Sequence, residues 1–207
     1  MTSERLVDNK IHSLLTSDNF TLIMIDFQPQ MAFAVKSIDG QSLINNAEGL
    51  AKAAKIFNVP TILTPVAEKS FAGPFFPQIK RVSPDQKIID RTTMNCWEDQ
   101  NVVKEVERIG RKKLVLSGLW IEVCIVLPAI QALEAGYEIY IIADACGGTS
   151  TTAHDMAMER VIQAGAVPMT WLQFLLELQR DWARTETYDT VTKLVREDAG
   201  TYGLGVE

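Results

Sequence analysis

The sequence predicts a three-layer α/β/α domain with a six-stranded parallel sheet in a Rossmann-like layout. Two observations lead to this fold class: short apolar runs bounded by turn residues recur along the chain, and amphipathic helical patterns alternate with them. Right-handed crossovers through the helices would join such strands in parallel. At 207 residues the chain is long enough for one sizeable core and short for two. We therefore expect a single domain over residues 1–207, with its core at about 18–183 and a C-terminal tail, 184–207, that contacts a neighbouring subunit.

Six apolar runs are too short for helices and are predicted to form the strands. They cover residues 20–26, 60–64, 87–90, 113–118, 138–144 and 166–170. The longest of them are apolar on both faces, which is typical of strands in a parallel sheet that is covered on each side.

Helical patterns fill the intervals between these runs. Two apolar stripes come first, and the second stops at Gly110. Two further helices should end at Gly136 and Gly165, because glycine readily adopts the left-handed conformation of a helix C-cap. The four helices are expected at residues 43–57, 102–109, 124–135 and 152–164. A last amphipathic segment, 171–183, should pack on the sheet or on a neighbouring subunit, and residues 198–207 should be frayed or depend on a partner.

The connection from residue 65 to residue 86 is unusually long for an α/β fold. It contains four of the eight prolines and three phenylalanines, Phe71, Phe75 and Phe76. One interpretation is an irregular excursion with a short helix, anchored by the three rings. The other is a wall over an active site or an oligomer contact, since aromatic loops serve both purposes.

The overall composition is that of an ordinary globular protein and argues against several kinds of partner. Apolar residues make up 47% of the chain, charged residues 22%, and the formal charge of -6 offers no field to attract nucleic acid or anionic lipid. The start lacks the apolar core of a signal peptide, and no stretch is long enough to span a membrane. Three widely spaced cysteines without CxxC pairing fit a reducing compartment. We expect a cytoplasmic protein that binds neither nucleic acid nor membrane.

Signature motifs of common cofactors are missing from the sequence. No GxGxxG follows the first apolar run and there is no GxxxxGK[ST], which argues against a dinucleotide or a nucleoside triphosphate. There is neither an HExxH motif nor a Cys/His cluster, and the two histidines are His12 and His154. We therefore expect no cofactor and no catalytic metal.

Reactive side chains follow three of the predicted strands. Asp26 comes after the first, Arg91 after the third, and a short turn after the fourth leads to Cys124. In open parallel sheets, ligands bind outside the carboxyl ends of the strands, so these three groups would meet at one edge. Taken singly, the aspartate could cap a turn and the arginine could form a surface ion pair. Together they outline a nucleophile site.

Cys124 itself has two interpretations. A buried cysteine in an apolar helix is more often a small core residue than a nucleophile. At a helix N-terminus, however, free N–H groups and the helix dipole can depress the thiol pKa, and Pro128 supports a helix start close to the cysteine. Cys146 is a weaker candidate thiol. His154 could pair with Cys124, although a contact near the helix cap is the commoner use of such a histidine.

Four segments together resemble the isochorismatase-like cysteine hydrolases, and most closely their YcaC-like branch. The segments are "LIMIDFQ", "DRTTMNCWED", "GLWIEVCIVLPAIQALEAGYEIYIIADACGG" and "TAHDMAMERVIQAGAVPMTW", in the family's order and spacing. The similarity spans about residues 20–182, and its most specific part is the glycine, short turn, "EVC" and apolar helix. The resemblance implies a six-stranded parallel sheet and a triad of aspartate, lysine and cysteine. It also implies a homo-oligomer, often an octamer of two stacked rings.

The family's triad maps onto Asp26 and Cys124, and Arg91 stands where the family has lysine. Arginine keeps the ion pair but cannot donate and recover a proton as a lysine with a lowered pKa can. The family also places a non-proline cis peptide bond before the cysteine, which would fall between Trp120 and Ile121. The metal-binding Asp and His set of the related nicotinamidases has no counterpart here.

The activity expected from these residues is hydrolysis of a small amide or ureide C–N bond through a thioester. Backbone N–H groups near Val123 and Cys124 would bind the oxyanion, in the turn that includes Trp120 and Ile121. The predicted site residues include no second cation to bind a carboxylate or phosphate, so we expect a small, partly apolar substrate. The predicted pocket residues are Phe27, Gln28, Trp97, Leu119, Trp120 and Ile121.

Two other functions stay open at this point. A thiol protein without hydrolytic turnover would use Cys124 against oxidants or electrophiles, since oxidation follows thiolate character and exposure. Alternatively, the fold could serve assembly alone, with a vestigial site. Release of amine from a panel of amides, compared with the peroxide reaction of the same thiol, distinguishes the hydrolase from the reactive-thiol protein. If the fold serves assembly alone, loss of Cys124 would leave the oligomer unchanged.

Overall fold

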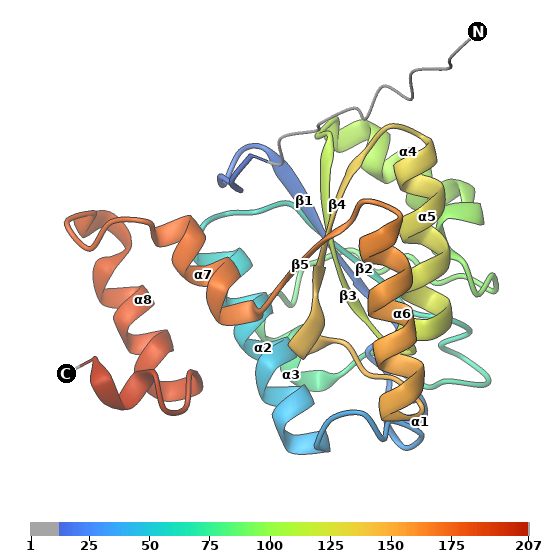
Figure 1. Ribbon diagram of the computed structural model, residues 1–207, viewed down its shortest axis with the longest axis horizontal. Coiled ribbons are helices and arrows are strands. Elements are labelled where there is room, and N and C mark those ends of the chain that lie inside the picture. Colours follow the sequence, from blue (N-terminus) through green and yellow to red (C-terminus); the bar gives the residue numbers. More distant parts are fainter. Residues whose placement is uncertain (1–12, 207) are drawn as a thin grey trace, which may run out of the picture.

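The computed structural model describes residues 13–206 of the chain, and its centre is a parallel sheet with helices on both faces (Figure 1). The strand order is β2-β1-β3-β4-β5, and every pairing is parallel. The strands are β1 (Phe20–Ile25), β2 (Thr61–Thr64), β3 (Lys113–Gly118), β4 (Glu138–Ile142) and β5 (Val167–Met169). The predicted α/β class and three-layer arrangement are therefore confirmed.

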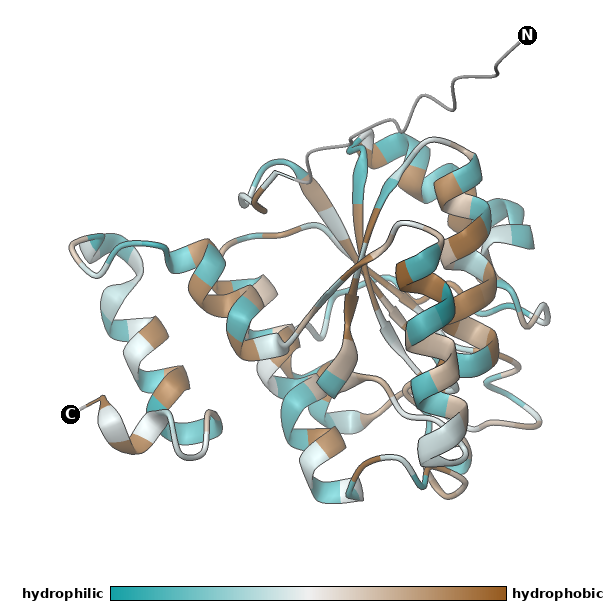
Figure 2. Ribbon diagram, in the orientation of Figure 1, coloured by the Kyte–Doolittle hydropathy of each residue, from teal (hydrophilic) through white to brown (hydrophobic). Residues whose placement is uncertain are grey.

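The helices form two groups, one on each face of the sheet (Figure 1). On one face lie α2 (Gly40–Ile56) and α7 (Trp171–Gln179), and α8 (Thr185–Asp198) packs on both of them. On the other face lie α4 (Gln100–Ile109), α5 (Val126–Glu134) and α6 (Thr151–Gln163). Successive strand residues point to opposite faces, so Leu22 and Met24 join the core under α2 while Ile23 and Ile25 join the core under α5. Figure 2 shows the strands as predominantly hydrophobic, as burial on both faces requires.

The prediction of six strands was wrong by one, because residues 87–90 do not form a continuous ladder. This segment runs parallel to β2 but makes only two isolated bridges, Leu63 with Ile88 and Val66 with Arg91. The backbone N–H of Ile89 donates to the carbonyl of Leu63 over 3.0 Å. The segment therefore lies beside the end of β2, and it still delivers Arg91 to the carboxyl edge of the sheet.

The predicted helices appear close to their expected positions, and glycine follows three of them with positive φ. Gly110 caps α4 with φ 76°, and Gly136 and Gly165 have φ values of 84° and 107°. These angles are the left-handed conformations that a side chain would disfavour.

The long connection after β2 matches its simpler interpretation in part. It carries one short helix, α3 (Pro77–Val82), and both Phe75 and Phe76 pack against the ring of Phe27, with ring centroids 6.1 and 5.8 Å away. Phe71, in contrast, is 62% exposed and anchors nothing in the core. A second short helix, α1 (Pro29–Ala32), follows β1 directly.

The C-terminal tail is folded rather than frayed. Beyond α8, a 3-10 turn spans Gly203–Gly205, and Nε of Arg196 donates to the carbonyl of Val206 over 2.7 Å. The contact of residues 184–207 with a neighbouring subunit stays a prediction. Across residues 13–206, no helix combines the length and the apolar character needed to cross a bilayer.

Candidate active site

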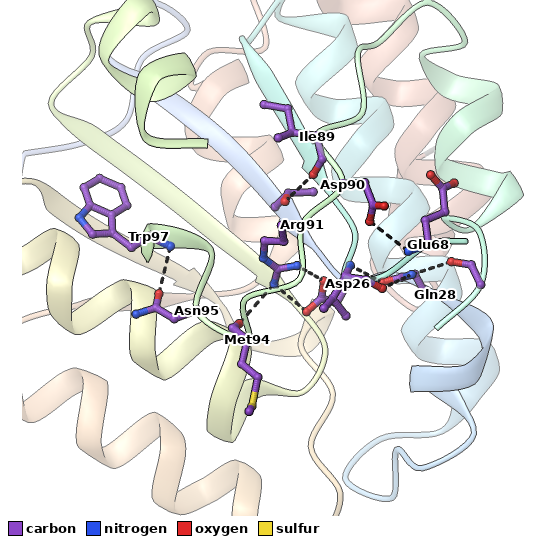
Figure 3. Close-up of polar contacts among 12 residues, drawn as sticks. Asp26, Gln28, Glu68, Ile89, Asp90, Arg91, Met94, Asn95 and Trp97 are labelled. Carbon is purple, nitrogen blue, oxygen red and sulfur yellow. Dashed lines mark hydrogen bonds and ion pairs between the residues drawn. The ribbon is translucent and has the colours of Figure 1, made fainter. Parts of the chain in front are cut away.

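The site is built around a buried ion pair between Asp26 and Arg91 (Figure 3). Nη1 of Arg91 lies 2.7 Å from Oδ1 of Asp26, and Nη2 lies 2.9 Å from Oδ2. This is the bidentate geometry in which a guanidinium holds a carboxylate most firmly. Both side chains are 0% exposed, so the orientation of the carboxylate is set by the arginine.

Asp26 and Arg91 both lie at the carboxyl edge of the sheet. Asp26 directly follows β1 and has φ 57°, a left-handed conformation that is costly for a residue with a side chain and is often found at functional sites. Arg91 sits at the end of the segment beside β2, where its N–H donates to the carbonyl of Pro65 over 3.2 Å. Its Nη2 also donates to the carbonyl of Met94 over 3.3 Å, which joins the arginine to the following loop.

Cys124 is carried by the turn that follows β3. A residue larger than glycine does not fit at Gly118, because a Cβ there would lie 2.0 Å from the carbonyl oxygen of Ile25. The peptide bond between Leu119 and Trp120 is cis, one residue earlier than predicted. A single π-helical turn, Ile121–Ile125, then leads into α5, so Cys124 lies at the start of a helix as expected.

The carboxylate of Asp26 and the thiol of Cys124 influence each other, since Asp26 raises the pKa of the thiol. The side chains of Asp26, Arg91 and Cys124 are thus brought together in one buried cluster, and Cys124 is 4% exposed. Burial raises the pKa of the thiol, and the charge and hydrogen bond of Asp26 raise it further, against a smaller opposing effect of Arg91. The expectation of a depressed thiol pKa was therefore wrong, because desolvation outweighs the helix N-terminus.

Asp26 is shifted in a direction that suits a proton acceptor. Desolvation raises the pKa of its carboxyl, while the hydrogen bond and charge of Arg91 oppose the shift. A buried carboxylate accepts a proton more readily than an exposed one, because burial penalises its charged form.

The backbone N–H groups predicted to hold an oxyanion are engaged within the turn. The N–H groups of Val123 and Cys124 both donate to the carbonyl of Trp120, over 3.0 and 2.8 Å. The sequence-based expectation that these two N–H groups are free was therefore wrong. The backbone of Trp120 opposes the rise in the pKa of the thiol, as the smallest of the effects on it.

Most of the predicted pocket residues lie inside the core. Phe27, Gln28, Leu119 and Ile121 are each 0% exposed. The side-chain amide of Gln28 is already hydrogen-bonded to the backbone. Its Nε2 donates to the carbonyls of Val66 and Gly73, and its Oε1 accepts from the N–H of Val66. These side chains therefore support the edge of the sheet from within. From the sequence alone, apolar residues next to a reactive group cannot be assigned to the pocket wall or to the core, because that depends on how the side chains pack.

The two predicted tryptophans differ in position. Trp97 packs edge-on against Tyr137, 5.2 Å between ring centroids, and Figure 3 shows it pointing away from the pair of Asp26 and Arg91. Trp120 is half-buried, and its Nε1 donates to the carbonyl of Met31 over 2.8 Å, which ties the cysteine turn to α1.

The rival groups, Cys146 and His154, have other surroundings or contacts. Cys146 is 0% exposed, and burial raises the pKa of its thiol to about 12. The Nε2 atom of His154 lies 3.2 Å from the carbonyl oxygen of Ala143, so this histidine makes a backbone contact rather than a dyad with Cys124. His12 lies outside the described residues. Within residues 13–206, no group of three or more His, Cys, Asp or Glu side chains could hold a metal ion.

Sequence reasoning missed polar groups that contact or neighbour the residues of this cluster. The carbonyl of Met94 and the side chain of Glu122, which accepts hydrogen bonds from Thr149, belong to this set. The only available signal for Glu122 was its place in the "EVC" segment.

The fold and the sequence assign the chain to a family. Residues 20–173 match the isochorismatase domain, and the chain therefore belongs to the isochorismatase family. It is 36% identical over 169 residues to the Escherichia coli (strain K12) protein called "Probable hydrolase YcaC", covering 81% of each chain.

Solved structures of YcaC proteins share the fold. The E. coli ycaC gene product, described as an octameric hydrolase of unknown specificity, superposes with a TM-score of 0.89 at 33% identity, over 93% of this chain and 94% of that one. YcaC from Pseudomonas aeruginosa, solved with hexane-2,5-diol and covalent acrylamide, gives 0.90 at 29% identity, over 94% and 96%. The expected resemblance to the YcaC branch is confirmed, and the chain is an isochorismatase-family hydrolase that is similar to YcaC proteins.

Proposed function

We propose that this protein hydrolyses a small amide or ureide C–N bond through a thioester on Cys124, with Asp26 and Arg91 as its catalytic partners and without a catalytic metal. The observation that carries the proposal is the buried cluster itself. A thiol whose pKa is raised needs a base within hydrogen-bonding reach, and the carboxylate of Asp26 is such a base.

In the first half of the reaction, Asp26 accepts the thiol proton as the sulfur attacks the substrate carbonyl carbon. Arg91 keeps the carboxylate oriented through its two hydrogen bonds. The backbone N–H of Trp120 is the donor that the developing oxyanion would meet first. The C–N bond then breaks, and the proton held by Asp26 passes to the leaving nitrogen, which departs as ammonia or an amine.

In the second half, water attacks the thioester carbonyl while Asp26 accepts a proton from it. The C–S bond breaks, the proton returns to sulfur, and the acid product leaves. Arg91 stays protonated throughout, so every proton transfer in this scheme runs through Asp26. The arginine that replaces the family's lysine is thus a fixed charge in the mechanism.

The charges at the site favour a neutral substrate. The fork of Arg91 is already occupied by Asp26, so a substrate carboxylate would be buried next to a carboxylate without a cation of its own, at high cost. Met94, which joins Arg91 through its carbonyl, is an apolar side chain that is 67% exposed. Small neutral amides with an apolar acyl group fit these surroundings.

A second candidate function is a reactive thiol without turnover. It is favoured by the P. aeruginosa YcaC structure with covalent acrylamide, since acrylamide is both an amide and an electrophile. The raised pKa of Cys124 argues against fast oxidation of a free thiolate, which is why we place hydrolysis first.

The test is a screen of small amides, ureides and carbamoyl compounds with detection of released ammonia or amine. The control is Cys124→Ala. A thioester trapped on Cys124 and seen by mass spectrometry would support the scheme, whereas turnover that persists undiminished in the alanine variant rules it out.

A further inference from the structure

We propose that Glu122 is a positioning residue for Cys124: its carboxylate anchors the turn that holds the sulfur against Asp26. The inference rests on the proposed function only in taking Cys124 as the reactive thiol. Glu122 lies two residues before the cysteine, inside the same π-helical turn, Ile121–Ile125.

The carboxylate of Glu122 binds the loop that leads into α6. Its Oε1 accepts hydrogen bonds from the hydroxyl of Thr149 over 2.6 Å and from the N–H of Thr149 over 3.1 Å. Its Oε2 is buried and has no hydrogen-bond partner among residues 13–206. Leaving an acceptor buried in this way has a free-energy cost, which the two bonds of the other oxygen must offset.

The loop is shaped to receive this carboxylate. A Cβ at Gly148 would lie 3.2 Å from Oε2 of Glu122 and 3.1 Å from Cβ of His154, so a side chain there would crowd both residues. The following residue, Thr149, then presents both of its donors to Oε1. Gly148 thus leaves space for the carboxylate of Glu122, whereas a Cβ at Gly147 would meet Leu119 and Val35 instead.

Backbone bonds hold the other parts of the turn to the same loop. The N–H of Ile121 donates to the carbonyl of Gly147 over 2.9 Å, and the N–H of Gly147 donates to the carbonyl of Gly118 over 3.2 Å. Glu122 adds the side-chain attachment next to them. Because Asp26 follows a different strand, its effect on the thiol of Cys124 depends on how this turn is placed.

The experiment measures alkylation of Cys124 by iodoacetamide against pH, followed by mass spectrometry, in the full chain. In Glu122→Ala the turn should loosen and carry the thiol away from Asp26, whose charge and hydrogen bond raise its pKa. The midpoint should then fall by about one pH unit. Glu122→Gln keeps an acceptor for Thr149 and should retain the wild-type midpoint.

Thr170→Ala is the matched control, because it removes the side-chain N-cap of α7, where Oγ1 of Thr170 accepts from the N–H of Gln173. It should lower the melting temperature without moving the midpoint. A Glu122→Ala midpoint that stays at the wild-type value, or a glutamine variant that shifts as far as the alanine variant, overturns the proposal.

If the alanine variant does not fold, Thr149→Val decides the question, since it removes the hydroxyl donor alone. Its midpoint must move in the same direction, and an unmoved midpoint overturns the inference. Alkylation needs no turnover, so a protein that releases no ammonia from any amide would contradict the proposed hydrolysis and leave this test valid.

Discussion

At the scale of single residues, the structure makes the acid, the guanidinium and the sulfur interdependent. The side chains of Asp26 and Arg91 are both buried and form a bidentate ion pair. Removing one partner of a buried pair leaves an uncompensated charge, which is far more costly than never having buried the pair. Substitutions at these positions therefore change stability and thiol chemistry together, and both must be measured.

Asp26→Asn should lower the pKa of the Cys124 thiol, because the charge and hydrogen bond of Asp26 raise it in the wild type. It should also lower the free energy of unfolding by about 3–5 kcal/mol, since Arg91 loses its counter-charge. The pH dependence of iodoacetamide alkylation and urea unfolding measure the two effects. Cys96, 1% exposed, serves as an internal control for unfolding. An unshifted alkylation midpoint would show that the sulfur does not sense the carboxylate.

Arg91→Lys should keep the charge but lose the fork, which costs about 1.5–3 kcal/mol for a hydrogen bond to a charged group. The matched variant Arg91→Met removes the charge as well and should cost more. It should also raise the thiol pKa further, because Arg91 opposes the upward shift at Cys124. Slower alkylation in the methionine variant than in the lysine variant checks this order, and equal rates would contradict it.

At the scale of elements, the carboxyl ends of β1 and β3 must approach closely to bring Asp26 near the cysteine turn. Gly118 permits this approach, and a Cβ there would strike the backbone of Ile25. Gly118→Ala should therefore lower the free energy of unfolding by about 1–3 kcal/mol, the range for overpacking. Gly40→Ala is the control, since nothing lies within 4 Å of its added Cβ. Urea denaturation of both variants measures the difference, and equal stabilities would refute the argument.

The start of α7 gives an element-scale prediction of pH dependence. Asp144 accepts a hydrogen bond from the N–H of Trp171 over 2.9 Å, and burial raises the pKa of its carboxyl. A raised folded-state pKa means that the folded chain binds the proton more tightly than the unfolded chain, so this group stabilises at low pH and loses that effect as pH rises through the folded value. Relative to the wild type, the free energy of unfolding of Asp144→Asn should thus be higher at pH 7 than at pH 4. Unfolding measured at both pH values tests the sign.

At the scale of the whole molecule, the assembly is the main expectation. The similar E. coli protein is described as octameric, and α8 with the tail forms the outer side of one helical layer (Figure 1). We expect light scattering to give a mass several times that of one chain. If residues 184–207 form the contact, Leu204→Glu should lower that mass, because Leu204 is 81% exposed and apolar. An unchanged mass would place the contact elsewhere.

Much of the fold could be predicted because periodicity is a local property. The alternation of apolar runs and stripes, and the glycines after three of the helices, depend on neighbouring residues alone. The strand at 87–90 was overcounted for the same reason: its apolar pattern is correct, but a ladder also requires a partner of matching length, and β2 offers only isolated bridges.

The sequence by itself determined the order of the elements and which reactive residues reach the carboxyl edge: Asp26, Arg91 and Cys124. Only the tertiary structure decided that Phe27 and Leu119 belong to the core, that the N–H groups near Cys124 are already bonded within the turn, and that the thiol pKa is raised. The physical reason is that burial and hydrogen-bond partners are sums over atoms brought together from distant parts of the chain. No local pattern contains those sums.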